Sequence, residues 1–232
     1  MKVLEEQIAE RREERDDPTI NEFEKLVGQY LKATPQHQSG QWRSLGGLDV
    51  SCRRKVRQIT DYILITSACV FVIEAKCYEG KILAEGDARR TEWFMQKSTG
   101  AKIQIKSAFK RNPYDQLCSY VDSVRNKLNQ IKVQSGIRIY GIIVFDLGAD
   151  VSEVSRQIGG NYHIITLDKL ISTIEEIETG CNNFLKEEIK LSPKQIEDLL
   201  CGRPLIKGIK SGLTKNKVNL VNQYGARAWG NY

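Results

Sequence analysis

Residues 61–76 constrain the fold of this chain more than any other segment. They read Asp-Tyr-Ile-Leu-Ile-Thr-Ser-Ala-Cys-Val-Phe-Val-Ile-Glu-Ala-Lys, which predicts two apolar strands joined by a short turn. In an antiparallel hairpin, a turn centred between Ser67 and Ala68 places Asp61 opposite Glu74. The Cβ atoms of two such facing residues lie about 4.5–5.5 Å apart. The pattern therefore predicts two carboxylates side by side at the open end of the hairpin.

A lysine belongs to the same group. Side chains alternate along a strand, so Glu74 and Lys76 share one face and Ala75 points to the other. The run 70–73 is apolar on both faces, which predicts a covered central strand. Charges at the end of a buried strand need a partner or an ion. Two carboxylates beside a lysine predict a site for a hard divalent cation next to a protonable amine, and the alternative is a solvated strand edge.

Composition narrows the class of protein. A chain of 232 residues with 41% hydrophobic and 28% charged residues predicts one domain with an appendage or two small ones. No apolar run approaches the roughly 20 residues of a membrane span, and the N-terminus lacks a signal-peptide stretch. Six scattered cysteines without a C-x-x-C pair predict reduced thiols in the cytoplasm, not a zinc site or a disulfide framework. With two histidines only, histidine-based nuclease or triad chemistry is disfavoured.

The positive charge is concentrated at one end. The net charge is +6, and residues 203–232 carry six basic and no acidic residues, so the excess lies in this tail. A basic tail on a neutral body is typical of a protein that binds a polyanion. A tail that is merely well solvated has the same composition, and the sequence leaves both interpretations open.

The rest of the chain predicts an α/β fold with a charged arm (1–18), a central domain (19–170) and a helical extension with a basic tail (171–232). Asn112 as N-cap, followed by Pro113, begins one predicted helix. The other predicted elements are helices from Thr19 and over 168–178, 182–190 and 193–201, strands over 48–52, 137–145 and 162–167, short strands within 78–108, and a loop over 38–47.

Two predicted helices carry further candidate residues. At 100° per residue, Glu24 lies at the edge of the apolar stripe of the first helix and can face a site at the core boundary. Boundary glutamates are also common on helices without such a role. On the helix after Pro113, Gln116 and Tyr120 are four residues apart and therefore share a face.

The ordered series of these motifs resembles a known family. Its members are Gln58–Tyr62, Val70–Lys76, Gly80–Ile82, Trp93, Asn112–Gln116, Gly141–Phe145 and Ile164–Leu167. Together they resemble the nuclease-related domain (NERD), a branch of the PD-(D/E)XK nuclease superfamily, over roughly residues 20–170. Gln116-x-x-x-Tyr120 is also similar to a helix motif of the RecB-like branch. Two positions depart from the family pattern, with Phe23 in place of a glycine and Tyr62 in place of a frequent histidine.

The resemblance implies a restriction-endonuclease-like fold, a mixed β-sheet core flanked by helices, here with a helical and basic C-terminal extension. It implies that Asp61, Glu74 and the Ala75 carbonyl ligate Mg²⁺ or Mn²⁺. It also implies that Lys76 is the catalytic lysine and that Glu24 matches the acidic residue of the first helix.

We therefore expect a metal-dependent DNA nuclease, with RNA as a possible substrate, in which Lys76 assists the attacking water or the transition state. Gln116 and Tyr120 would position the water or a backbone phosphate. The alternatives are a non-catalytic nucleic-acid-binding or scaffolding module, and a subunit that needs a partner. Such a partner is a second copy of the chain, a helicase or a defence-system subunit. The candidate phosphate contacts are Arg53, Arg54, Lys55, Lys110, Arg111, Lys207, Lys210, Lys215 and Lys217.

Overall fold

A five-stranded mixed sheet forms the centre of the protein. The computed structural model describes residues 18–51, 58–108, 112–130, 137–182 and 191–202. In spatial order, the strands are β1 (Arg43–Gly46), β2 (Tyr62–Ile65), β3 (Cys69–Lys76), β7 (Arg138–Phe145) and β9 (Tyr162–Thr166). The first three are antiparallel, whereas β3, β7 and β9 are parallel. The sheet confirms the predicted α/β fold, with the hairpin 61–76 at its centre.

The register of the hairpin confirms the predicted turn. Tyr62 pairs with Ile73 and Ile65 with Val70, as a turn between Ser67 and Ala68 requires. All eight residues of β3 are buried, because helices cover both faces of this strand. Continuous apolar sequence is typical of a strand that is buried in this way.

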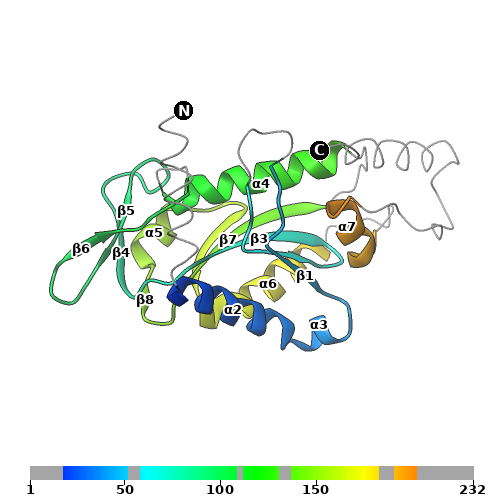
Figure 1. Cartoon of the computed structure of the whole chain (residues 1–232), viewed down its shortest axis with the longest axis horizontal. Coiled ribbons are helices and arrows are strands. Elements are labelled where there is room, and N and C mark those ends of the chain that lie inside the picture. The colour runs from blue at the N-terminus through cyan, green and yellow to red at the C-terminus, as the bar shows by residue number, and fades with distance from the viewer. Residues whose placement is uncertain (1–17, 52–57, 109–111, 131–136, 183–190, 203–232) are drawn as a thin grey trace, which may run out of the picture.

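Helices lie on both sides of the sheet (Figure 1). One face packs against α4 (Pro113–Gln130), through side chains such as Val72 of β3. The other face packs against α2 (Pro18–Lys32) and α6 (Leu170–Asn182), through side chains such as Phe71. The shorter helices are α3 (Pro35–Gln38), α5 (Ser152–Gln157), the 3₁₀ helix η1 (Leu167–Lys169) and α7 (Pro193–Leu200).

A smaller sheet stands at one end of the molecule (Figure 1). Its strands, in spatial order, are β6 (Lys102–Gln104), β5 (Trp93–Gln96), β4 (Gly80–Ala84) and β8 (Ala149–Asp150). The sequence predicted the short strands but not that they form a sheet of their own. Gly80 begins β4 with φ +96°, and a Cβ there would lie 2.7 Å from the Gln96 carbonyl oxygen. Only glycine fits this junction without strain.

Two motif residues hold the smaller sheet against α4. Trp93 Nε1 and Asn112 Nδ2 both donate to the Ala88 carbonyl, at 2.7 and 3.3 Å. Asn112 Oδ1 also accepts from the Asp115 amide at 2.8 Å, which confirms Asn112 as the N-cap of α4. These two residues of the family-like series therefore have a structural role.

Two predicted elements are wrong. The predicted strand 48–52 is reduced to an isolated bridge between Asp49 and Ile59, with Cys52 outside the described residues. Asp49 Oδ1 accepts from the Ser51 amide at 3.0 Å, so this turn takes that N–H out of a ladder. The predicted loop 38–47 contains β1, because pairing with β2 overrides the local glycine and serine signals.

The other boundaries differ less. The first helix starts at Pro18, and the helix predicted over 168–178 is η1 followed by α6. The predicted helix 182–190 lies outside the described residues beyond Asn182, as do the arm 1–17 and the tail 203–232. None of the helices in the described part of the chain combines the length and apolar character of a membrane span.

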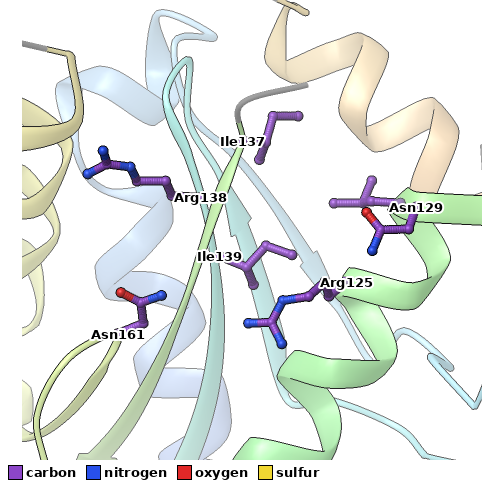
Figure 2. Close-up of a pocket in the computed structure, with 7 residues that line it drawn as sticks. Arg125, Asn129, Ile137, Arg138, Ile139 and Asn161 are labelled. Carbon is purple, nitrogen blue, oxygen red and sulfur yellow. The ribbon is translucent and has the colours of Figure 1, made fainter. Parts of the chain in front are cut away.

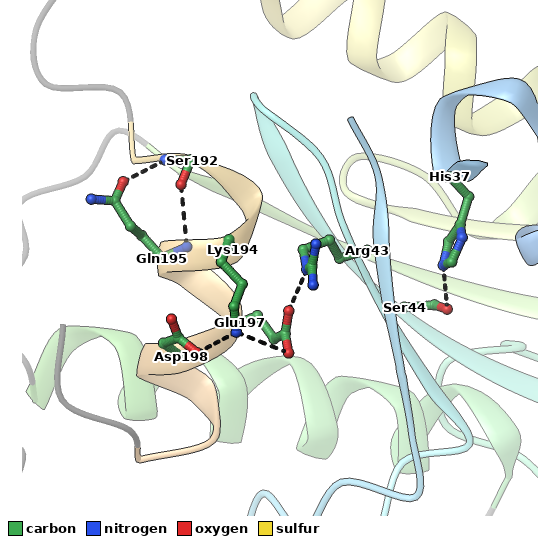
Figure 3. A network of polar contacts seen from close by, with 8 residues as sticks. All are labelled: His37, Arg43, Ser44, Ser192, Lys194, Gln195, Glu197 and Asp198. Carbon is green, nitrogen blue, oxygen red and sulfur yellow. Dashed lines mark hydrogen bonds and ion pairs between the residues drawn. The ribbon is translucent and has the colours of Figure 1, made fainter. Parts of the chain in front are cut away.

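The predicted last helix is confirmed as α7, and it packs on the α4 side of the sheet. Leu199 and Leu200 join the same core as α4. Ser192 and Gln195 form a capping box at its start, and Glu197 pairs with Arg43 of β1 (Figure 3). The chain after residue 170 therefore shares its cores with the region before it.

Candidate functional site

The candidate site lies at the C-terminal end of β3, on the face that α4 covers. Glu74 and Lys76 are 2% and 5% exposed, and Lys76 Nζ lies 3.2 Å from Glu74 Oε1. Burial of a charge is unfavourable unless it is paired and hydrogen-bonded. The pair therefore meets the expectation that charges at the end of this strand have partners.

Asp61 reaches the same strand from the neighbouring chain segment. It immediately precedes β2, and its Oδ2 accepts from the Ala75 amide at 2.8 Å. The ladder between β2 and β3 ends at the Tyr62–Ile73 pair, and one further step in the same register would place Asp61 opposite Glu74. The hydrogen bond to Ala75 orients the Asp61 carboxylate next to β3, in agreement with the predicted pairing.

Gln116 and Tyr120 share a face of α4, as predicted, and Gln116 contacts the site directly. Gln116 Nε2 donates to Glu74 Oε1 at 2.5 Å and to Tyr120 Oη at 3.1 Å. Both α4 side chains are buried. Glu74 therefore receives a lysine from its own strand and an amide from α4 on the same carboxylate oxygen.

The sequence did not reveal two further residues of this network. Ser107 Oγ and the Ala108 amide both donate to Gln116 Oε1, at 2.8 and 3.1 Å. The preceding residue is held as well, since the Lys106 amide donates to Tyr78 Oη at 3.3 Å. This stretch has no periodic pattern and no motif, so no sequence signal could have identified it.

Glu24 lies on the α2 side of the hairpin, near Tyr62. Burial raises the pKa of Tyr62, and the charges of Glu24 and Asp61 raise it further. The ring of Tyr62 packs so closely on α2 that a Cβ at Gly28 would lie 2.3 Å from the Tyr62 hydroxyl. In the described ranges, no group of three or more His, Cys, Asp or Glu side chains is placed to hold a metal ion. Glu24 thus does not form a three-carboxylate cluster with Asp61 and Glu74 here.

The donor set nevertheless suits a hard divalent cation. Asp61 and Glu74 would supply carboxylate oxygens from neighbouring chain segments, and the family resemblance implies the Ala75 carbonyl as a further oxygen ligand. Mg²⁺ is typically held by one or two carboxylates and keeps several waters, and Mn²⁺ also prefers oxygen ligands. The residues present fit either ion.

The predicted phosphate contacts are not among the described residues. Arg53, Arg54 and Lys55 fall in 52–57, Lys110 and Arg111 in 109–111, and the four lysines of the tail in 203–232. Lys106 is the basic residue next to Ser107, and it is exposed.

A separate hollow of about 290 Å³ lies at the other end of the central sheet (Figure 2). It is formed by the last turns of α4, the start of β7 and Asn161. Arg138 begins β7 there, whereas Glu74 pairs with Ile143 farther along the same strand. No candidate site residue lines the hollow, which contains Arg125, Leu128, Asn129, Ile137, Arg138, Ile139 and Asn161.

Within the described ranges, Gln116 donates a hydrogen bond to Glu74, and the cysteine and histidine side chains there lie in other surroundings. The five cysteines in the described ranges are free thiols, as the sequence predicted. Burial raises the pKa of Cys69 and lowers the pKa of His163, so both favour their neutral forms. His163 is half-buried and faces Tyr140, with ring centroids 6.3 Å apart.

Comparison with known proteins gives one match. A family model described as nuclease-related domain (NERD) matches residues 20–146, which is more than half of the chain. The matched region contains Asp61, Glu74, Lys76, Gln116 and Tyr120, and it ends directly after β7. No curated protein and no solved structure matches the chain.

Proposed function

The chain belongs to the nuclease-related domain family, and from this premise we propose that it is a metal-dependent nuclease that hydrolyses phosphodiester bonds of DNA. The observation that carries the proposal is the convergence of Asp61, Glu74 and Lys76 at the end of β3. Two carboxylates and an amine in one place are the groups that metal-assisted phosphodiester hydrolysis needs.

In this proposal Asp61, Glu74 and the Ala75 carbonyl would hold Mg²⁺ or Mn²⁺. When bound, such an ion makes a coordinated water more acidic and polarises the phosphate. The Ala75 amide fixes the direction of the Asp61 carboxylate, and Gln116 fixes that of Glu74. Glu24 is proposed as an outer carboxylate, whose charge acts from beside Tyr62.

Lys76 has the most direct chemical role among the side chains. Its ammonium group carries three hydrogen-bond donors, and it lies 3.2 Å from Glu74 Oε1 at the end of β3. We propose that this ammonium group orients the attacking water or stabilises the negative charge that develops on the phosphate. Gln116 acts one step away, because it binds Glu74 and orients that carboxylate. The sequence-based expectation that Gln116 and Tyr120 position the water or a backbone phosphate stays a prediction.

One observation favours a second candidate, a nucleic-acid-binding module or a nuclease subunit that is silent until a partner arrives. Lys76 and Gln116 both occupy Glu74 Oε1 in a buried arrangement. The charge of Glu74 is therefore compensated without a metal ion. A protein that binds DNA but does not cleave it would keep this arrangement.

A cleavage assay with three variants separates the two candidates. Supercoiled and linear DNA are incubated with the protein and Mg²⁺, Mn²⁺ or EDTA. We expect cleavage by the wild type with metal only, loss of cleavage in Glu74→Gln and Lys76→Met, and retention in Glu197→Gln. Glu197 is the matched control, because it is also a buried, ion-paired carboxylate but lies on α7. Metal-independent binding without cleavage by the wild type would favour the second candidate instead.

A further inference from the structure

We infer that Ser107 is a positioning residue, which acts through Gln116 to set the direction of the Glu74 carboxylate. The inference rests on the proposed function of Glu74 as a metal ligand. It assigns a role to Ser107, which the sequence alone left without one.

The side-chain amide of Gln116 has two chemically different ends, and each has two partners. Its Oε1 accepts from Ser107 Oγ and from the Ala108 amide, at 2.8 and 3.1 Å. Its Nε2 donates to Glu74 Oε1 and to Tyr120 Oη, at 2.5 and 3.1 Å. The amide thus bridges the segment 107–108 and the candidate site.

Only one orientation of this amide satisfies its neighbours. A backbone N–H can only donate, and an ionised carboxylate can only accept. A half-turn of the Gln116 amide would therefore set its NH₂ against the Ala108 N–H and its oxygen against Glu74. The Ala108 N–H therefore selects the orientation in which an N–H points at Glu74. The Ser107 hydroxyl, which can donate or accept, adds a second hydrogen bond that holds the amide in place. Burial strengthens this selection, since Gln116 is 5% exposed and water cannot replace the lost partners.

The segment 105–108 is itself held in place by both neighbouring parts of the protein. The Ile105 amide donates to the Trp93 carbonyl of β5 at 2.8 Å, and the Ile105 side chain is buried. The Lys106 amide donates to Tyr78, two residues after Lys76. The backbone from Ile105 to Ser107 is therefore hydrogen-bonded to the smaller sheet at one end and, through Ser107 and Gln116, to Glu74 at the other.

This connection explains why the smaller sheet accompanies the site. A glutamate side chain near the end of a strand rotates about its side-chain bonds unless neighbouring residues restrict it. Partners of metal-binding carboxylates typically affect metal affinity by about 10- to 100-fold. Removal of the Ser107 hydroxyl leaves the Ala108 N–H in place, so we expect an effect at the low end of that range.

The test compares Ser107→Ala, Ser107→Thr and Ser44→Ala in the full chain. Ser44 is the matched control, because its half-buried hydroxyl also makes a side-chain hydrogen bond but does so with His37, away from Gln116. Two quantities are measured: Mn²⁺ affinity by titration without DNA, and the ¹H–¹⁵N signals of the Gln116 side-chain amide. Those signals are identified by their loss in Gln116→Met.

We expect Ser107→Ala to shift the Gln116 signals and to weaken Mn²⁺ binding about 10-fold. Ser107→Thr should restore both, because threonine keeps the hydroxyl, and Ser44→Ala should change neither. Unchanged Gln116 signals in Ser107→Ala, or an equal effect of Ser44→Ala on both quantities, would overturn the inference. If the wild type itself does not bind Mn²⁺, the proposed function fails, and the Gln116 signals alone then decide whether Ser107 positions this amide.

Discussion

The two faces of the central sheet are built from different chemistry. On the α2 and α6 side, the side chains of β3 and β7 that pack against the helices are almost all apolar, including Phe71, Ile73 and Ile142. On the α4 side, a polar row runs along the helix through Gln116, Ser119, Ser123 and Lys127, next to the apolar residues of the same helix. The candidate site lies at one end of this row.

The polar row is fully engaged with the segments beside the hairpin. Gln58 Nε2 donates to Ser119 Oγ at 2.8 Å, and Ser123 Oγ donates to Gln58 Oε1 at 2.6 Å. At the far end Lys127, which is 3% exposed, donates to the Asp49 carbonyl at 3.1 Å. Each of these contacts is a directional hydrogen bond in a buried location.

The two faces of the sheet therefore have different roles, one in the stability of the fold and the other in the placement of α4. Apolar contacts stabilise in proportion to buried area, but they tolerate small slides of a helix along a sheet. Hydrogen bonds between buried partners are lost when the helix moves by a fraction of a turn. The α2 and α6 face thus mainly stabilises the sheet, and the α4 face also fixes where Gln116 meets Glu74.

The largest expected effect is chemical and confined to the α4 face. Glu74→Gln and Asp61→Asn should each reduce DNA cleavage by on the order of 100-fold or more, the size found when one preorganised electrostatic group is removed. Asp61→Asn should change the melting temperature little, whereas Glu74→Gln should lower it, because the buried Lys76 then loses its counter-charge. Rates of plasmid cleavage and thermal unfolding curves measure the two quantities. Cleavage at the wild-type rate in both variants would show that the site is assigned wrongly.

The next effect is a loss of stability on the opposite face. Phe71 is fully buried and stacks on Tyr140 with ring centroids 5.7 Å apart. Phe71→Ala should lower the free energy of unfolding by about 3–5 kcal/mol, through lost burial and the cavity that remains. Urea unfolding measures this change. Cleavage per folded molecule should stay near the wild-type value, and a parallel loss of cleavage would contradict the separation of the two faces.

A substitution that disturbs the polar row should destabilise the protein less than Phe71→Ala does, but should reduce DNA cleavage more. Gln58→Leu removes the amide that binds Ser119 and Ser123, so it should lower the free energy of unfolding by about 1–3 kcal/mol. Cleavage per folded molecule should also fall, because α4 loses part of its anchoring to the hairpin. Paired urea unfolding and cleavage rates for Gln58→Leu and Phe71→Ala test the comparison directly. A cleavage loss in Phe71→Ala that exceeds the loss in Gln58→Leu would reverse it.

The sequence was sufficient for the hairpin and its charged end, because these depend on local patterns. Two continuous apolar runs, a short turn and the spacing of Glu74 and Lys76 determine which residues face each other. The spacing of Gln116 and Tyr120 likewise determined their shared helix face. The sequence could not reveal that Gln116 binds Glu74, since that contact joins residues 42 positions apart.

Other features depend on tertiary pairing that no local signal encodes. The smaller sheet exists because β4, β5 and β6 pair away from the central sheet, with Trp93 and Asn112 meeting at Ala88. β1 forms in a glycine- and serine-containing stretch because β2 offers it an open edge. Ser107 enters the site network only because the smaller sheet and α4 bring it there.

The smallest predicted effect is a dependence of stability on pH that belongs to the apolar face. Burial is the main cause that lowers the pKa of His163, and the charge of Glu176 opposes it in part. The folded state therefore binds this proton less readily than the unfolded chain, whose histidine titrates at about 6.5. The contribution to stability is complete above pH 6.5 and is lost as the pH falls from there through the folded pKa.

Replacement of this histidine tests the assignment. We expect the free energy of unfolding of the wild type to decrease from pH 7.5 to pH 5.5, and His163→Asn to show a smaller decrease. Part of the decrease should remain in the variant, because burial and the charges of Lys32 and Arg43 also lower the pKa of His37. Urea unfolding at the two pH values measures both slopes. An equal decrease in the free energy of unfolding for wild type and variant would mean that the α2 and α6 face does not disfavour the charged imidazole. The two faces of the sheet would then differ less than the burial of His163 implies.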